Sequence, residues 1–104
     1  MRMRWRVAAS VLSVLCSWVL WEKHITNRGL QAITAVRETA ILVDCRKAIT
    51  DAVKHAEVEF KKQYKGQVRA VEDEVLLSED GKAISEQYVY YCLPSTVDPY
   101  HDPR

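Results

Sequence analysis

The chain has 104 residues, of which 48% are hydrophobic and 28% are charged, and its formal net charge is +1. This composition excludes an intrinsically disordered chain, and the length accommodates one globular domain. Three of the 15 basic residues fall within the first six positions, so the rest of the chain is slightly acidic and lacks the basic excess of a nucleic-acid-binding protein.

Residues 1–17 have the pattern of a signal for export across a membrane. The chain opens with three arginines and no acid, at Arg2, Arg4 and Arg6. An apolar run follows at residues 7–15, and Cys16 and Ser17 then supply the small residues of a cleavage site. We therefore predict a signal peptide over residues 1–17, cleaved near Ser17, and a protein that resides in the periplasm or outside the cell.

Two alternatives for this segment stay open. The apolar stretch continues through residues 18–21, which would suit a retained membrane anchor, although it is shorter than the roughly 18 to 20 residues needed to span a bilayer. The other alternative is a lipoprotein, because Cys16 lies where a lipidated cysteine would sit. Leu15 is a poor fit to the small residue that usually precedes such a cysteine.

The segment after the predicted signal has the composition of a strand. Residues 18–24 are rich in aromatic and branched side chains and lead into the turn-like sequence of residues 26–29. A less regular alternation predicts a second, short strand at residues 30–36.

A long amphipathic helix is predicted at about residues 40–65, which contain neither glycine nor proline. Apolar residues recur there at spacings of three and four: Cys45, Ile49, Ala52, Val53, Ala56, Phe60 and Tyr64. Gly66 follows a basic last turn, as expected just beyond a helix C-terminus.

Residues 67–77 and 83–92 are both strand-like. The five residues between them contain an Asp-Gly pair at residues 80–81, which favours a tight hairpin turn. Four residues of the second strand follow a period of two and so share a face: Ile84, Tyr88, Tyr90 and Cys92. We predict an antiparallel hairpin whose apolar face packs against the helix.

Together these elements predict an α+β fold over residues 18–93. One long amphipathic helix packs on a small antiparallel sheet in the order β-(β)-α-β-β, where the bracketed strand is the short one at residues 30–36. Three prolines and several polar residues fall in residues 94–104, which we predict to be an extended C-terminal tail.

The two cysteines outside the predicted export signal are Cys45 and Cys92. Cys45 lies on the apolar stripe near the start of the helix and Cys92 ends the last strand, so a bond between them would tie the helix to the sheet. An exported chain with two cysteines typically carries one disulfide. We therefore predict the Cys45–Cys92 bond, and a pair of free buried thiols is the alternative.

The sequence lacks a nucleophile elbow, a P-loop and a dinucleotide fingerprint, so we predict no cofactor and no enzymatic activity. His101 and Asp102 would suit a metal or general-base site, but no local spacing supplies the three or four ligands of a metal site, and we predict none. His55 lies four residues from both Asp51 and Glu59. That spacing would suit a proton-transfer pair or ordinary charge pairing on a solvated helix face.

Aromatic residues gather in the first and last predicted strands. The four side chains concerned are Trp18, Trp21, Tyr88 and Tyr90. Exposed rings of this kind anchor protein partners or glycans, so we treat the four as candidate partner-binding residues. The alternative is that the rings fill the space between helix and sheet.

Three features resemble a group of small exported bacterial proteins: the WVLWEK sequence at residues 18–23, the helical Cys45 and the YCLPSTVDP sequence at residues 91–99. That group is similar in having a WVLW start after the signal peptide and a CLPxTVDP ending. The resemblance implies export, the same fold and the Cys45–Cys92 pairing, and it implies no catalytic residues. The chain departs from the group at residues 100–102, where Tyr-His-Asp replaces a more usual Arg-Gly-Pro type of ending.

These observations lead to three functional hypotheses. The first is a non-enzymatic interaction or structural module of the cell envelope, with a protein partner that the sequence does not identify. The second is a membrane-anchored accessory subunit that touches the membrane only through residues 1–17. The third is a small envelope enzyme or metal-binding protein that uses His101 and Asp102. A nucleic-acid partner is not expected.

Overall fold

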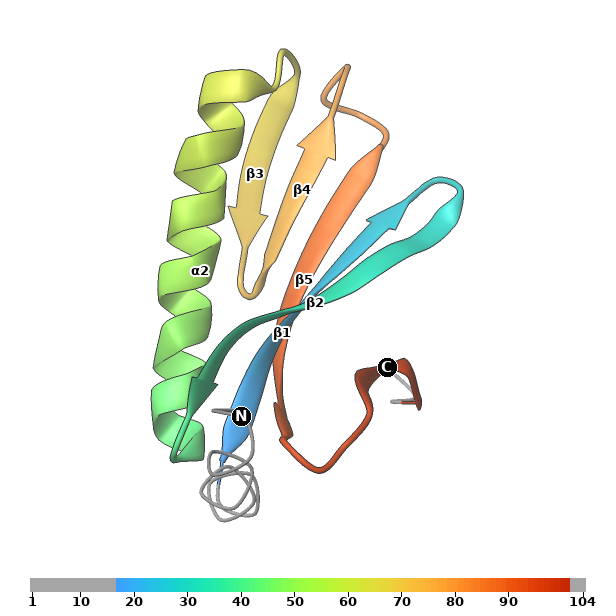
Figure 1. Ribbon diagram of the computed structural model, residues 1–104. Coiled ribbons are helices and arrows are strands. Elements are labelled where there is room, and N and C mark those ends of the chain that lie inside the picture. Colours follow the sequence, from blue (N-terminus) through green and yellow to red (C-terminus); the bar gives the residue numbers. More distant parts are fainter. Residues whose placement is uncertain (1–16, 102–104) are drawn as a thin grey trace, which may run out of the picture.

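Alternating aromatic and branched residues form the strands, and the segment free of glycine and proline forms the one long helix (Figure 1). The computed structural model describes residues 17–101. In chain order the elements are β1 (Trp18–Thr26), β2 (Gly29–Thr39), α2 (Leu42–Gln63), β3 (Gln67–Val71), β4 (Glu74–Ser78), β5 (Glu86–Pro94) and the short 3-10 helix η1 (Pro99–His101). The predicted α+β class, with one long helix on an antiparallel sheet, is confirmed.

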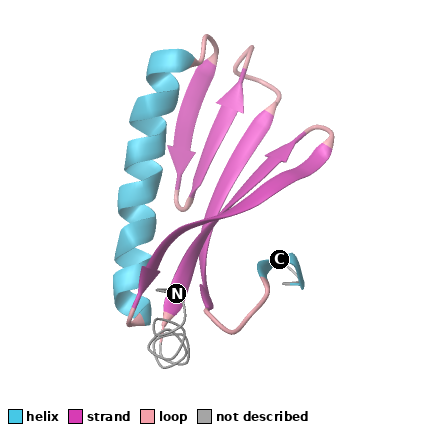
Figure 2. Cartoon of the chain, viewed as in Figure 1, coloured by secondary structure: helices cyan, strands magenta, loops and turns pink. Residues whose placement is uncertain are grey.

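The described strands form one five-stranded antiparallel sheet in the order β2-β1-β5-β4-β3 (Figure 2). The first and last strands of the chain are therefore neighbours, and Leu20 of β1 pairs with Cys92 of β5. Cross-strand partners share a face of the sheet. The face that packs against α2 carries Leu20, Glu22 and His24 of β1 and Cys92, Tyr90 and Tyr88 of β5.

The predicted short strand at residues 30–36 is the middle of the eleven-residue β2. β1 and β2 form a hairpin whose turn ends at Gly29, where the φ angle of 105° suits glycine. The backbone N–H of Arg28 donates a hydrogen bond of 3.1 Å to Thr26 Oγ1 within this turn. β2 is an edge strand, and two register shifts interrupt its pairing with β1.

The helix α2 occupies most of the predicted range 40–65. Its buried side chains recur at spacings of three to five residues: Cys45, Ala48, Val53 and Ala56. Two lysines in the last turn complement the helix dipole, and the backbone N–H of Tyr64 donates to the carbonyl of Phe60 at 2.7 Å where the helix ends. The apolar stripe of the sequence therefore marks the face that packs on the sheet.

Residues 67–77, predicted as one strand, form two strands joined by a tight turn. Val71 of β3 pairs with Glu74 of β4, which leaves a two-residue turn at Glu72 and Asp73. Glu72 has a φ angle of 53°, in the left-handed region that favours glycine. Because a glutamate occupies this position instead of a glycine, the sequence carries no turn signal here. The prediction of a single strand was wrong, and the observed order is β-β-α-β-β-β.

The Asp80-Gly81 pair lies in the loop between β4 and β5, and this loop is longer than the predicted tight turn. Gly81 has a φ angle of 76°, and the Asp80 carboxylate accepts hydrogen bonds from the backbone N–H groups of Lys82 at 2.8 Å and Ala83 at 3.2 Å. These two bonds lower the pKa of the Asp80 carboxyl. The predicted pairing of the two flanking segments is present with a wider connection.

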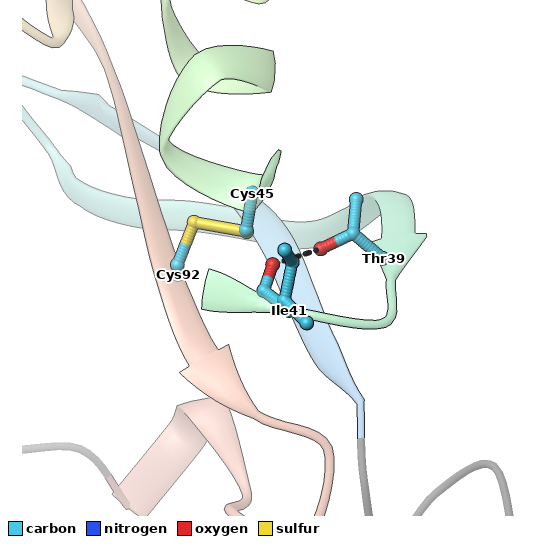
Figure 3. Close-up of a disulfide and its surroundings, with 4 residues drawn as sticks. All are labelled: Thr39, Ile41, Cys45 and Cys92. Carbon is cyan, nitrogen blue, oxygen red and sulfur yellow. Dashed lines mark hydrogen bonds between the residues drawn. A yellow bond between two sulfur atoms is a disulfide. The ribbon is translucent and has the colours of Figure 1, made fainter. Parts of the chain in front are cut away.

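The predicted disulfide is confirmed. Cys45 in the first turns of α2 is bonded to Cys92 in β5, with a Cα–Cα distance of 6.3 Å and a sequence separation of 47 residues (Figure 3). Cys45 is fully buried. Nearby, Thr39 Oγ1 donates a 3.1 Å hydrogen bond to the carbonyl of Ile41, where the chain passes from β2 into the helix.

The segment after β5 differs from the predicted extended tail at residues 94–104. Pro94 is the last residue of β5, and Pro99 is buried at the start of η1. The Tyr100 hydroxyl lies 3.5 Å from the backbone oxygen of Ile33, so residues 95–100 fold back toward the edge strand β2. Residues 1–16, which hold nearly all of the predicted export signal, and residues 102–104 lie outside the described part.

Candidate functional site

A groove runs between α2 and the first two strands, on the helix-bearing face of the sheet. It encloses about 550 Å³. Leu20, Glu22 and Tyr90 line it from the sheet, and Val36 and Arg37 of β2 line the side opposite the helix. This volume lies within the range of ligand-binding pockets. We call this hollow the α2–hairpin groove.

Alanines form the helix side of the α2–hairpin groove. Ala48, Ala52 and Ala56 follow one another at intervals of four residues, so they lie on one face of α2. An alanine side chain is a single carbon, which leaves space that a larger apolar residue would fill. Phe60, one turn further on, does reach the sheet, and its ring centroid lies 4.7 Å from that of Tyr88.

A buried tyrosine and a carboxylate share the floor of the groove. The Tyr90 hydroxyl donates a hydrogen bond of 2.5 Å to Glu22 Oε2, and only 2% of Tyr90 is exposed. Burial raises the pKa of Tyr90 far above its usual value, and the hydrogen bond to Glu22 acts in the same direction. The phenol is therefore neutral at physiological pH, and its hydrogen bond holds the Glu22 side chain in place.

An aromatic stack extends from this floor toward the turn of the β1–β2 hairpin. The rings of His24 and Tyr88 stack with centroids 4.3 Å apart, and His24 Nε2 lies 2.8 Å from Glu86 Oε1. Burial, followed by the charge of Glu86, raises the pKa of Tyr88 to about 12. The stacking and the contact with Glu86 position the two rings beside the groove floor.

Charged side chains form the rim of the groove. Asp51, His55 and Glu59 project from α2 at intervals of four residues, and Arg37 projects from β2. Glu59 pairs with Lys62 Nζ at 3.3 Å. Asp51, His55 and Arg37 form no ion pair within 4.0 Å with any residue between 17 and 101. The pairing of His55 with Asp51 or Glu59 that the spacing allowed is therefore not formed.

The four candidate partner-binding aromatics do not form a single surface. Tyr88 and Tyr90 lie on the face toward α2, where Tyr90 belongs to the buried core and Trp18 packs against that core. Trp21 pairs with Tyr91 on the opposite face of the sheet. Its indole nitrogen is buried and has no hydrogen-bond partner among the described residues.

Glu22, Arg37 and Ala48 were not predicted from the sequence, and Ala52 and Ala56 were predicted only as members of the apolar stripe of the helix. The four-residue spacing of the alanines was the sequence feature that could have indicated a groove. Small residues inside the apolar stripe of a helix leave a hollow where the opposite element does not fill the space. Glu22 gave no signal, because its partner Tyr90 lies 68 residues further along the chain.

Two of the hypotheses drawn from the sequence involve a metal or a membrane. Within residues 17–101, no three His, Cys, Asp or Glu side chains come together in a way that could hold a metal ion. His101 closes η1, and its proposed companion Asp102 lies outside the described part. Over the same residues, no helix combines the length and the apolar character needed to cross a bilayer.

The lining of the α2–hairpin groove is partly apolar and partly charged. Its lining combines apolar side chains with carboxylates, an arginine and a histidine, and the described lining residues include no serine, threonine or cysteine nucleophile. Comparison of the chain with protein-family models, with curated proteins and with solved structures found no match.

Proposed function

We propose that this protein is an exported, non-enzymatic interaction module that binds a partner protein through the α2–hairpin groove. The observation that carries the proposal is an open groove of about 550 Å³ with an apolar interior and rim charges, several of which have no ion-pair partner among residues 17–101.

The exposed apolar surface of the groove supports this proposal. Val36 is 45% exposed at one side, and Ala52 and Phe60 are partly exposed at the other. Covering apolar surface contributes about 25 cal/mol per Å², so a partner that fills the hollow gains affinity there. Rim charges such as Asp51 and Arg37 would set the orientation of the partner.

The helix wall is fixed near both of its ends, which supports a preformed site. The Cys45–Cys92 bond holds the first turns of α2 against β5. Just beyond the last turn, the Tyr64 hydroxyl and Ser85 Oγ lie 2.9 Å apart in a hydrogen bond. A partner therefore meets a groove whose walls need little ordering, which lowers the entropic cost of binding.

Export is the second part of the proposal. Disulfides persist mainly in oxidising compartments such as the periplasm and the cell exterior, and the Cys45–Cys92 bond fits such a compartment. The pattern of residues 1–17 and the resemblance to small exported bacterial proteins point the same way. A retained N-terminal anchor would leave the groove and its partner unchanged and would only place the module at the membrane surface.

The intact mass of the native protein tests export. We expect a product that begins near Trp18 and whose two cysteines resist alkylation until a reductant is added. A native product that retains residues 1–17 unmodified, with all thiols free in the cytosol, would overturn this part of the proposal.

Filling the groove tests binding. Ala52→Trp places a large ring in the hollow, whereas Val58→Trp adds the same ring at a position that is 51% exposed and does not line the groove. With cross-linked envelope extracts, we expect wild type and Val58→Trp to capture the same partner and Ala52→Trp to lose it, while circular dichroism shows both variants folded. Equal capture by both variants, or turnover of a small substrate without any partner, would contradict the proposal.

A further inference from the structure

One helix covers only part of the sheet face on which it lies. Strands about 4.8 Å apart make a five-stranded sheet roughly 20 Å across, whereas a helix with its side chains is about 10 Å in diameter. In Figure 1, α2 runs beside β3, and the turn end of the β1–β2 hairpin diverges from it. Because α2 also contacts β1 and β2, the uncovered area lies over the part of these two strands toward their turn.

Two small side chains of β2 lie on this part of the sheet face. In β2, Thr34 pairs with Glu22 and Ala32 pairs with His24, so both β2 residues lie on the face toward α2. Both are exposed. Small residues on β2, together with the alanines on the adjacent helix, allow another backbone to approach closely at this side of the groove. A second helix laid beside α2 fits this space, because helices packed side by side have axes about 8–10 Å apart.

The charges around this space are mainly acidic. Among the residues that line the α2–hairpin groove, Glu22, Asp51 and Glu59 are acids and Arg37 is the one arginine or lysine. A helix with basic residues along its edges would complement this rim, and an acidic helix would be repelled.

We propose that the α2–hairpin groove binds a basic amphipathic helix of a partner protein, laid alongside α2 over β1 and β2. The apolar stripe of that helix covers Val36 and Ala52, and its lysines or arginines meet Asp51 and Glu59. This inference rests on the binding function proposed above and adds the chemical class of the partner.

A second copy of this chain is a poorer occupant. The long helix of the described part, α2, already buries its apolar stripe against its own sheet, through Cys45, Ala48, Val53 and Ala56. The outward face of α2 that would remain for such a contact carries charges of both signs, including Lys54, Glu57 and Lys61. That face lacks the continuous apolar stripe that a helix needs to enter a groove.

Two synthetic helical peptides serve as probes. The basic peptide carries leucines on one face and lysines on the other, and its acidic twin has glutamate at every lysine position. Fluorescence anisotropy with the disulfide-bonded protein measures both affinities. We expect the basic peptide to bind at least tenfold more tightly than the acidic twin, with an affinity that falls as salt is raised.

Charge reversal at the rim locates the peptide. The double variant Asp51→Arg, Glu59→Arg should weaken the basic peptide at least tenfold and improve binding of the acidic twin. The charge-matched control Glu72→Arg, Glu79→Arg alters two exposed acids that lie outside the groove lining, and it should change either affinity by less than about twofold. Equal binding of both peptides to wild type, or equal effects of the two double variants, would overturn the inference.

The same variants separate this inference from the function on which it rests. If Ala52→Trp abolishes capture of the envelope partner but the Asp51→Arg, Glu59→Arg variant still captures it fully, the groove is a binding site and the basic helix is wrong. If Ala52→Trp has no effect on capture, the binding function itself fails. A concentration-dependent dimer that Ala52→Trp dissociates would identify a second copy as the occupant and would also overturn the inference.

Discussion

Reduction of the Cys45–Cys92 bond should remove a large part of the stability of this fold. The bond joins residues separated by 47 positions, and closing a loop of that length stabilises the native state by about 4 kcal/mol in the chain-entropy model. A domain of this size has a total free energy of unfolding of about 4–13 kcal/mol. The reduced protein is therefore expected to be marginally stable.

Urea unfolding of the oxidised and reduced protein measures this difference. Trp18 and Trp21 lie in β1, directly beside β5, so tryptophan fluorescence reports loss of the central strand pair. With an m-value of about 2 kcal/mol/M, the transition midpoint should fall by about 2 M on reduction. Hydrogen exchange should accelerate first in the turns of α2 near Cys45, because the bond fixes that end of the helix.

A variant without the bond controls for other effects of the reductant. Cys45→Ala, Cys92→Ala should unfold at the same urea concentration with and without reductant, and at a lower concentration than oxidised wild type. If reduction lowers the free energy of unfolding of wild type by less than about 1 kcal/mol, the chain-entropy reasoning does not hold for this loop. Helix packing alone would then hold α2 on the sheet.

Three further outcomes are expected from the same fold. The pKa values of Tyr88 and Tyr90 are raised above the usual value of 10, that of Tyr88 to about 12. The stability that the two neutral phenols contribute is therefore complete below pH 10 and is lost as the pH rises toward 12 and beyond. Phenolate absorbance recorded alongside circular dichroism should show both tyrosines titrating as the protein unfolds. Glu72→Gly should stabilise the β3–β4 turn by about 0.5–1 kcal/mol in denaturant titrations, because Glu72 has a positive φ angle. Gly66→Ala should destabilise the protein by about 1–3 kcal/mol in thermal melts, because its Cβ would clash with the carbonyl oxygen of Ser78.

Local patterns predicted the parts of the fold that depend on local periodicity. The helix was predictable because its buried residues follow the helical repeat from Cys45 to Ala56 without a glycine or proline. The period-two run that ends at Cys92 likewise predicted which side of β5 faces the helix. The disulfide followed from these two assignments, because each cysteine lies on the side of its element that packs on the other.

Features that depend on a single backbone conformation or on distant pairing were not predictable. The turn at Glu72 uses a left-handed conformation at a residue that seldom adopts it, so residues 67–77 read as one strand. The groove depends on the pairing of β1 with β5, which brings Glu22 to Tyr90 across most of the chain. The return of Tyr100 to Ile33 is also a long-range contact, without a local signature in the sequence.

The disulfide and the groove depend on the same part of the sheet. Cys92 of β5 pairs directly with Leu20, which lines the groove floor. Its disulfide partner Cys45 lies three residues before Ala48, the first alanine of the groove wall. The covalent bond therefore fixes the position of the helix wall relative to the floor at one end of the groove. A compartment that kept both thiols reduced would loosen that wall as well as destabilise the fold. The stability of the fold and the shape of the groove therefore both depend on the Cys45–Cys92 contact between α2 and β5.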